Sequence, residues 1–291
     1  MTHTPEAILA DLRTLGVLPA HCRVCAPLPG GTGGGAFGVG SGGPPEFVLK
    51  LGDPGSTAAE ARFLQTYGDL PLLPRLRHAD PGRGHLVYAY IPGATRREAG
   101  LKASALLTLA GGLVGRYLPA KAGEAWGWLE APSPAWPDFL AAAAADARSV
   151  IGGRLSAADH AFAQALAGSR RRQPAGGGCL IHGDCGFHNF VFDAGRLRGV
   201  IDPLAAVGPP IFDLIYAFCS TPADLEPGAL EAAARLLPSW DPPTPGALWE
   251  EALVGLYCRL ATCLRHHPDD LAAYLSAWPR WRALAEGAWA R

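Results

Sequence analysis

Polar residues interrupt an apolar stretch between positions 179 and 220. His182 and Asp184 stand two residues apart, and Asn189 follows Asp184 after four intervening residues. Asp202 ends the second of two short apolar runs. Carboxylate and amide oxygens with open positions suit Mg²⁺, which completes its shell with waters and substrate phosphates. A carboxylate that is not needed as a ligand could accept the proton of a hydroxyl nucleophile. We therefore predict a phosphoryl-transfer site.

These oxygens converge if the two apolar runs pair as a hairpin. Residues 190–192 and 197–201 are rich in β-branched and aromatic residues and flank a turn that contains glycine. With the turn centred on residues 195–196, Asn189 lies opposite Asp202. Directly opposed residues have Cβ atoms about 4.5–5.5 Å apart, so we expect the amide and the carboxylate to meet at one point.

The motif His-Gly-Asp-x4-Asn at 182–189, followed by Asp202, resembles the catalytic loop and metal-binding motif of the aminoglycoside phosphotransferase-like kinases. That family includes choline, fructosamine and homoserine kinase relatives and shares the protein-kinase plan. The resemblance implies that Asp184 is the catalytic base and that Asn189 and Asp202 are magnesium ligands. The chain departs from many relatives at 208–210, where Gly-Pro-Pro replaces Gly-Asp-Pro, a change in a structural turn.

The resemblance also implies an α+β fold with the two lobes of a protein kinase. We expect a small N-terminal nucleotide-binding lobe with an antiparallel sheet at 1–91. A larger, mainly helical lobe at 92–291 should hold the catalytic loop and the acceptor site. His182 and Asp213 are expected to support the catalytic loop structurally.

A glycine-rich run at 30–38 precedes the strand expected at 46–50. Its backbone N–H groups could approach phosphate oxygens, because glycine tolerates the φ angles of a tight cradle. A hairpin loop without a ligand fits the run equally well. The glycines expected to bind nucleotide are Gly33, Gly34 and Gly35.

Lys50 ends that strand, and Glu60 follows ten residues later on an expected helix capped by Ser56. In kinases, a lysine on a strand and a glutamate on the next helix form the ion pair that holds the α- and β-phosphates. Exposed Lys and Glu are ordinary when they stand alone. The downstream motif, in the right order, favours the nucleotide site.

Residues 85–93 predict a strand that ends at a Pro-Gly break. In the resembling family this segment links the lobes and its backbone hydrogen-bonds the adenine edge. This implies that Ala89, Tyr90 and Ile91 offer backbone groups to the base. The resemblance implies that Tyr88 also flanks the base, and a plain core position is the alternative for this residue.

The rest of the chain is predominantly helical in pattern. Residues 126–136, rich in Pro and Trp, predict an irregular loop, and Arg170, Arg171 and Arg172 predict a solvated surface run. Apolar residues at helical spacing predict helices at 5–15, 101–118, 139–151, 156–167, 213–219, 230–237, 247–264 and 271–288.

Composition excludes several classes. Of 291 residues, 49% are hydrophobic and 18% charged, which is typical of a globular chain with an ample core. A net charge of -1 gives no general attraction to nucleic acid or an anionic membrane. The N-terminus lacks an apolar signal core, and residues 106–114 are too few to span a bilayer, which takes about 20. Seven cysteines, an odd number in a long chain without a secretion signal, argue against a disulfide framework. We expect a cytoplasmic protein without nucleic-acid or membrane partners; its oligomeric state stays open.

Together these patterns predict a small-molecule kinase that uses Mg²⁺ and transfers the γ-phosphoryl of ATP, or of GTP, to a hydroxyl of an unidentified acceptor. One alternative is a metallohydrolase with His182, Asp184 and His188 as ligands. Another is a nucleotide-binding pseudokinase without turnover, although such a chain has no chemical need for the full set of polar residues. A polycationic aminoglycoside would call for several convergent carboxylates, which the sequence does not place visibly.

Overall fold

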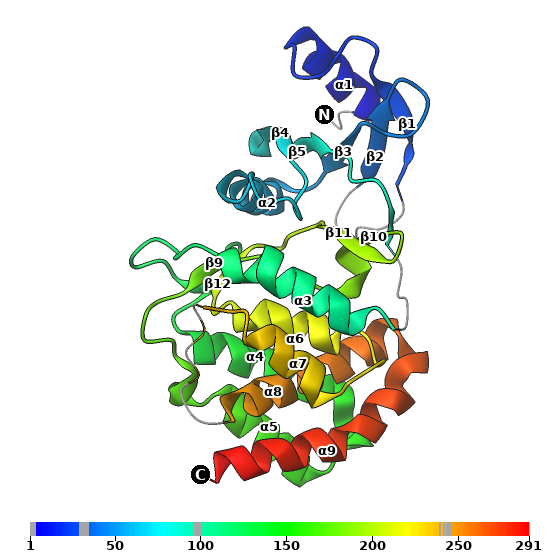
Figure 1. Cartoon of the computed structure of the whole chain (residues 1–291). Coiled ribbons are helices and arrows are strands. Elements are labelled where there is room, and N and C mark those ends of the chain that lie inside the picture. The colour runs from blue at the N-terminus through cyan, green and yellow to red at the C-terminus, as the bar shows by residue number, and fades with distance from the viewer. Residues whose placement is uncertain are drawn as a thin grey trace.

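The computed structural model describes residues 4–28, 35–95, 100–238, 240, 242 and 246–290. These residues form two stacked lobes, a smaller one built on a sheet and a larger one built mainly of helices (Figure 1). The expected α+β, two-lobed arrangement is therefore confirmed. The sheet of the smaller lobe is antiparallel, with strands in the order β1 (Arg23–Pro27), β2 (Ala36–Gly40), β3 (Phe47–Leu51), β5 (His85–Ala89) and β4 (Leu76–Asp80).

The two faces of this sheet have different roles, because side chains alternate along a strand. Leu49 of β3 belongs to a cluster that packs under helix α1 (Pro5–Thr14), which contributes Ile8 and Leu12. Val48 and Lys50 point to the opposite face, toward the larger lobe. Thr4 caps α1, with its hydroxyl accepting the N–H of Ala7 at 3.3 Å.

Helix α2 (Pro54–Thr66) contacts both lobes. Its N-cap is Asp53, whose carboxylate accepts the N–H of Ser56 at 3.0 Å, so the prediction of Ser56 as the cap is wrong. Tyr67, which directly follows α2, donates to the carbonyl of Leu180 at 2.6 Å. The ring of Phe63 meets the ring of His182 edge-on, with centroids 5.5 Å apart. These contacts hold the helix that carries Glu60 against residues 182–189, the predicted catalytic loop.

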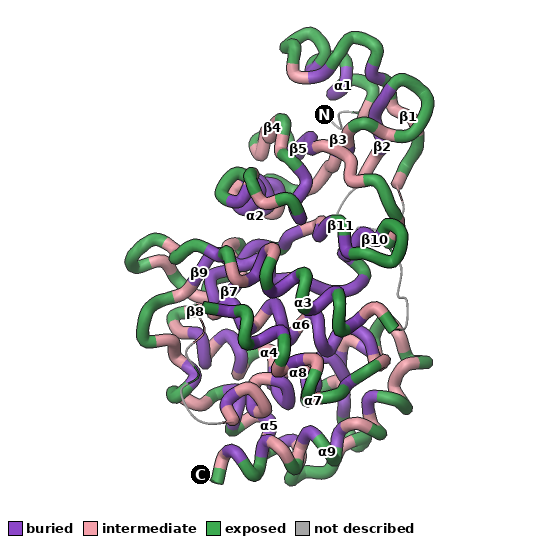
Figure 2. The backbone as a smooth tube through the Cα atoms, in the orientation of Figure 1, coloured by how far each residue is buried: buried purple, intermediate pink, exposed green. Residues whose placement is uncertain are grey.

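The larger lobe buries its core between helices. Helix α6 (Ile211–Cys219) is nearly all buried, whereas α5 (Ala157–Ala167) and α9 (Leu271–Trp289) alternate between buried and exposed residues on the outside (Figure 2). The helix expected at 101–118 ends at Gly112, and no helix among the described residues is long and apolar enough to cross a membrane. The helices are α3 (Lys102–Gly112), α4 (Trp136–Ile151), α5 (Ala157–Ala167), α6 (Ile211–Cys219), α7 (Pro227–Ala234), α8 (Ala247–His266) and α9 (Leu271–Trp289).

Two small sheets flank the catalytic loop. Residues 126–136, predicted as irregular, contain strands β7 (Trp126–Trp128) and β8 (Pro132–Ser133). The first sheet runs β8 (Pro132–Ser133), β7 (Trp126–Trp128), β12 (Ala206–Gly208) and β9 (Cys179–Ile181); the second runs β11 (Arg196–Val200), β10 (Phe190–Asp193) and β6 (Ala94–Thr95). The loop between β9 and β10 is thus held at both ends by strand pairing.

The register of the β10–β11 hairpin differs from the prediction. The turn is Ala194–Gly195, with φ angles of 48° and 71°, and a bulge leaves Arg198 without a partner across the pair. As a result the N–H of Ile201 donates to the carbonyl of Asn189 at 3.0 Å. Asn189 faces Ile201, so the predicted direct opposition of Asn189 and Asp202 is wrong by one residue.

Candidate active site

Asp213, in the first turn of α6, is fully buried and bonds the catalytic loop from below. Its Oδ1 accepts the N–H of Gly183 at 2.9 Å, and its Oδ2 accepts the N–H of His182 at 2.8 Å. The hydroxyl of Tyr117 donates to the same Oδ2 at 2.6 Å. Burial raises the pKa of Asp213 to about 6, although these three hydrogen bonds oppose the shift. Asp213 thereby ties α6 to the backbone of the loop.

His182 is held between the two halves of the site. Its Nδ1 accepts the N–H of Asp184 at 3.2 Å, and its Nε2 lies 3.1 Å from the carbonyl of Ile201. Nε2 therefore carries the proton and donates it. Burial lowers the pKa of His182 to about 4, so the ring is neutral at pH 7. Because both ring nitrogens are engaged, the alternative metal set of His182, Asp184 and His188 does not assemble.

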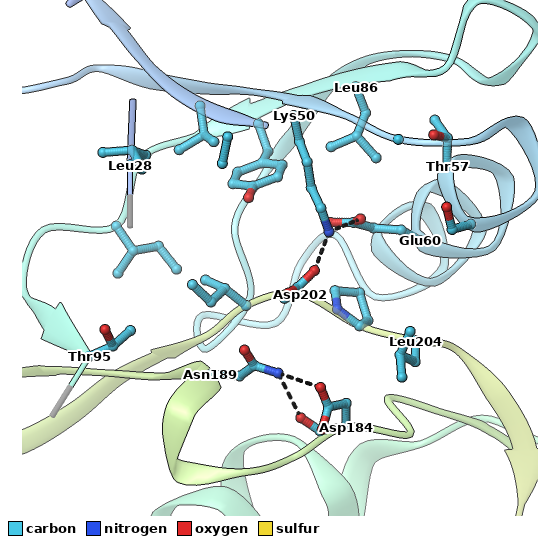
Figure 3. Close-up of a pocket in the computed structure, with 18 of the residues that line it drawn as sticks. Leu28, Lys50, Thr57, Glu60, Leu86, Thr95, Asp184, Asn189, Asp202 and Leu204 are labelled. Atoms are coloured by element: carbon cyan, nitrogen blue, oxygen red, sulfur yellow. Dashed lines mark hydrogen bonds and ion pairs between the residues drawn. The ribbon is translucent and has the colours of Figure 1, made fainter. Parts of the chain in front are cut away.

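The carboxylate of Asp184 is oriented by its neighbours on the loop. The side-chain amide of Asn189 donates to Asp184 Oδ2 at 2.9 Å and to its carbonyl at 3.0 Å (Figure 3). Nε2 of His188 lies 3.2 Å from the same Oδ2. Burial alone would raise the pKa of Asp184. The hydrogen bond and charge of His188, together with the hydrogen bond of the Tyr216 hydroxyl, outweigh burial, so the pKa of Asp184 lies below its usual range. The carboxylate is therefore ionised at neutral pH.

Lys50 crosses from the smaller lobe to the larger one. Its Nζ donates to Glu60 Oε2 at 2.6 Å and contacts the carboxylate of Asp202 (Figure 3). Burial raises the pKa of Glu60, which is 3% exposed, to about 7. Burial alone would lower the pKa of Lys50, but the two carboxylates outweigh it and raise the pKa, so Lys50 is cationic. Asp202 adopts a left-handed φ of 63°, which only a minority of non-glycine residues do.

A cleft of about 770 Å³ separates the lobes and contains these groups. This volume lies in the usual range of ligand pockets, about 300–1,000 Å³. Its ceiling is one face of the sheet, with Ala36, Val48, Lys50, Leu86 and Tyr88, and its floor includes Asp184, Asn189, Val191, Ile201 and Asp202. Lys50 and Asp184, which are 134 positions apart in the chain, thus share one solvent-accessible space.

Of the other residues predicted to bind nucleotide, some line the cleft and some lie outside the described residues. Gly33 and Gly34 lie outside the described residues, whereas Gly35 pairs through its carbonyl with the N–H of Leu51 at 2.8 Å. Tyr90 and Ile91 line the cleft.

Two of the three backbone N–H groups at positions 89–91 already donate hydrogen bonds to backbone carbonyls. The N–H of Ala89 donates to the backbone carbonyl of Arg75 at 2.9 Å, and the N–H of Tyr90 donates to the backbone carbonyl of Glu46 at 3.0 Å. Among the described residues the N–H of Ile91 makes no hydrogen bond. Of the three N–H groups, that of Ile91 is therefore available to a ligand, and the prediction that all three residues offer backbone groups to the base stays a prediction.

Two neighbours of Asp184 were not predicted as members of the site. His188 was considered as a metal ligand of the alternative metallohydrolase, yet it hydrogen-bonds the carboxylate. Tyr216 of α6 lies next to Asp184, and its burial, together with the charge of Asp184, raises its pKa well above the usual range. Tyr216 follows Asp213 by three residues, so helical spacing alone could have indicated that both lie on one face.

Comparison with known proteins agrees with this geometry. Residues 24–249 match the model of the phosphotransferase enzyme family, and comparison with curated protein sequences gave no match. A thermostable mutant of aminoglycoside phosphotransferase APH(4)-Ia is similar in fold, with a TM-score of 0.61, 18% identity and coverage of 97% of this chain and 98% of that one.

Two further solved structures share the fold. The macrolide 2′-phosphotransferase MphH from Brachybacterium faecium has a TM-score of 0.57 and 18% identity, over 92% of this chain and 98% of that one. The choline kinase of Cryptosporidium parvum Iowa II has a TM-score of 0.58 and 10% identity, over 98% and 96%. The chain belongs to the phosphotransferase enzyme family and has its protein-kinase-like fold, so the predicted enzyme class is confirmed.

Proposed function

We propose that this phosphotransferase is a magnesium-dependent small-molecule kinase that transfers the γ-phosphoryl of ATP, or of GTP, to a hydroxyl of its acceptor. One observation carries the proposal: the Lys50–Glu60 pair of the smaller lobe shares a cleft with Asp184, Asn189 and Asp202 of the larger one. The division into a nucleotide-binding lobe at 1–91 and an acceptor lobe at 92–291 is part of this proposal.

Asn189 and Asp202 fit a magnesium ion chemically. The amide nitrogen of Asn189 donates its hydrogen bonds to Asp184. The amide oxygen faces away from Asp184 and would be free to bind the ion (Figure 3). Asp202 supplies a carboxylate on the same cleft. Oxygen-only donors with few protein ligands are what Mg²⁺ prefers, and the bound ion would neutralise phosphate charge. Lys50 adds a second positive charge, and Glu60 orients it.

Asp184 would act on the acceptor. Its ionised carboxylate takes the proton of the hydroxyl while the hydroxyl oxygen bonds to the γ-phosphorus. The bond from that phosphorus to the β,γ-bridging oxygen breaks, and the nucleoside diphosphate leaves. Asn189 and His188 hold the carboxylate in one orientation, so little rearrangement is needed at the moment of transfer.

Apolar side chains suit the flat base of a nucleotide. Ala36 and Val48 line the ceiling of the cleft, Val191 and Ile201 line its floor, and the N–H of Ile91 can donate to a ring nitrogen. Structures of aminoglycoside phosphotransferase APH(4)-Ia have been solved as ternary complexes with ADP and hygromycin B and with AMP-PNP and hygromycin B. By analogy, we assign the nucleotide to the cleft between the lobes.

The test is release of nucleoside diphosphate from ATP or GTP with Mg²⁺, over a panel of sugars, amino alcohols, aminoglycosides and hydroxy acids, with the product identified by mass spectrometry. We expect acceptor-dependent release that is lost in Lys50→Ala. Lys121→Ala, a change outside the cleft, is the matched control and should retain it. Nucleotide binding without release for any acceptor would favour the pseudokinase instead.

A further inference from the structure

A second pocket, of about 350 Å³, lies within the larger lobe among α4, α6 and α8. Aromatic rings form one wall: the centroid of Phe139 lies 5.2 Å from that of Trp128 and 6.0 Å from that of Phe212. Aliphatic and small residues of α4, α6 and α8 complete most of the lining. The pocket thus suits an apolar body.

The positive and negative charges of the side chains that line this pocket are unequal in number. Arg172, whose side chain is 3% exposed, pairs with Glu251, so the prediction that Arg172 lies on a solvated surface is wrong. Arg259 also lines the pocket and is 7% exposed. It is paired with no carboxylate among the described residues. Two arginines against one glutamate leave a net positive charge.

The guanidinium of Arg259 has unused hydrogen-bonding capacity. Its Nε donates to the hydroxyl of Tyr274 at 3.1 Å, while its buried Nη2 has no acceptor among the described residues. A buried cation is costly unless an anion or a full set of acceptors accompanies it. An anionic ligand in the pocket would supply the countercharge, and the forked guanidinium of arginine favours such anions.

The pocket adjoins the catalytic loop. Tyr216 lines it and lies next to Asp184. The ring of Trp128 packs so closely on Gly183 that a Cβ added there would lie 2.6 Å from the ring. Within the turn that follows β7, Glu130 lines the nucleotide cleft, whereas Ala131 lines the second pocket. A ligand held here would therefore lie beside the proposed base.

We propose that this pocket binds the acceptor, and that the acceptor has an apolar, ring-sized body and an anionic group, such as a carboxylate, that pairs with Arg259. The proposal rests on the kinase function proposed above and specifies its substrate class. A polycation would meet uncompensated positive charge in this pocket, so aminoglycosides are disfavoured as its occupants.

Three matched probes test the charge preference: 4-(hydroxymethyl)benzoate, the neutral 4-(hydroxymethyl)benzamide and the cationic 4-(hydroxymethyl)benzylamine. Binding is measured by calorimetry on the full chain without nucleotide. We expect the benzoate to bind at least tenfold more tightly than the benzamide, and the benzylamine to bind most weakly. Absence of benzoate binding at millimolar concentration, or equal affinity for the three probes, would overturn the proposal.

Two arginines of α8 provide variants that test whether Arg259 causes the preference for the anionic probe. Arg259→Gln should abolish the tenfold advantage of the benzoate while leaving benzamide binding unchanged, and Arg259→Lys should restore part of it. Arg265→Gln, which removes an exposed arginine of α8 paired with Asp146, should leave the preference intact. An unchanged preference in Arg259→Gln contradicts the assignment.

Measuring probe binding and phosphoryl transfer independently distinguishes failure of the pocket proposal from failure of the proposed kinase function. If the benzoate does not bind but another acceptor is phosphorylated, the pocket proposal fails and the kinase function stands. If the benzoate binds through Arg259 but no compound in the panel is phosphorylated, the kinase function fails and the anion-binding pocket stands.

Discussion

The side-chain amide of Asn189 donates a 2.9 Å hydrogen bond to Oδ2 of Asp184. This one contact sets two orientations: it directs the carboxylate of Asp184 and turns the oxygen of Asn189 toward the cleft (Figure 3). The proposed base and a proposed metal ligand are therefore interdependent, and changing one should disturb the other.

Asn189→Ala should affect both functions at once. Loss of the amide removes the oxygen ligand and frees the Asp184 carboxylate. We expect a lower rate of transfer and a higher Mg²⁺ concentration for half-maximal activity, measured by magnesium titration of nucleoside diphosphate release. A variant that loses rate but keeps the magnesium dependence would remove Asn189 from the metal site.

Asp213→Asn should destabilise the fold, because the amide presents a donor where the carboxylate accepts from His182, Gly183 and Tyr117. A buried donor left facing donors costs about 1–3 kcal/mol in free energy of unfolding, measured by urea denaturation. Asp193→Asn, at the exposed end of β10, should change stability by less than about 0.5 kcal/mol. Equal effects of the two changes would contradict the supporting role of Asp213.

His182 should make stability depend on pH. Its pKa is about 4 in the folded chain and near 6.5 when unfolded, so the unfolded state binds more protons between these values. Stability contributed by the neutral ring is therefore present above pH 6.5 and is lost as pH falls toward 4. The loss amounts to about 3 kcal/mol relative to His182→Gln.

The measurement is urea unfolding of both proteins between pH 4 and pH 7.5. Asp213 titrates in the wild type and in the variant, so the difference between the two curves isolates His182. Parallel curves would mean that the ring is already protonated, or accessible, in the folded protein.

Gly183 and Gly177 offer a matched pair of changes, with φ angles of 81° and 84°. Alanine at either position pays about 1–2 kcal/mol for a left-handed backbone. At Gly177 nothing lies within 4 Å of the new Cβ, whereas at Gly183 the Trp128 ring must shift. We expect Gly183→Ala to lower both the melting temperature and the transfer rate more than Gly177→Ala. Equal effects on rate would show that the packing of Trp128 does not position the loop.

The residues that sequence predicts well are those joined by local pattern. Lys50 at a strand end and Glu60 on the next helix form their ion pair at 2.6 Å, because strand and helix periodicity already direct both side chains inward. Asp184 and Asn189 stand on one short loop, so their spacing limits how far apart they can be. The type of fold follows from these patterns and from the resemblance that they carry.

What sequence did not predict depends on packing between distant segments. The bulge at Arg198 shifted the register of Asn189, and strand patterns do not reveal a single extra residue. Arg172 looked like a surface residue because its partner, Glu251, is 79 positions away on another helix. Tyr216 is brought to Asp184 only by the docking of α6.

The central claim is that Asp184 is the base for phosphoryl transfer, and Asp184→Asn tests it most directly. The change keeps the shape of the side chain but removes its capacity to take a proton. Nucleotide affinity and transfer rate are measured on the same preparation, by calorimetry and by nucleoside diphosphate release. We predict unchanged nucleotide affinity with transfer slowed by about 10²–10⁴-fold. Transfer at the wild-type rate by a folded Asp184→Asn variant would contradict the account.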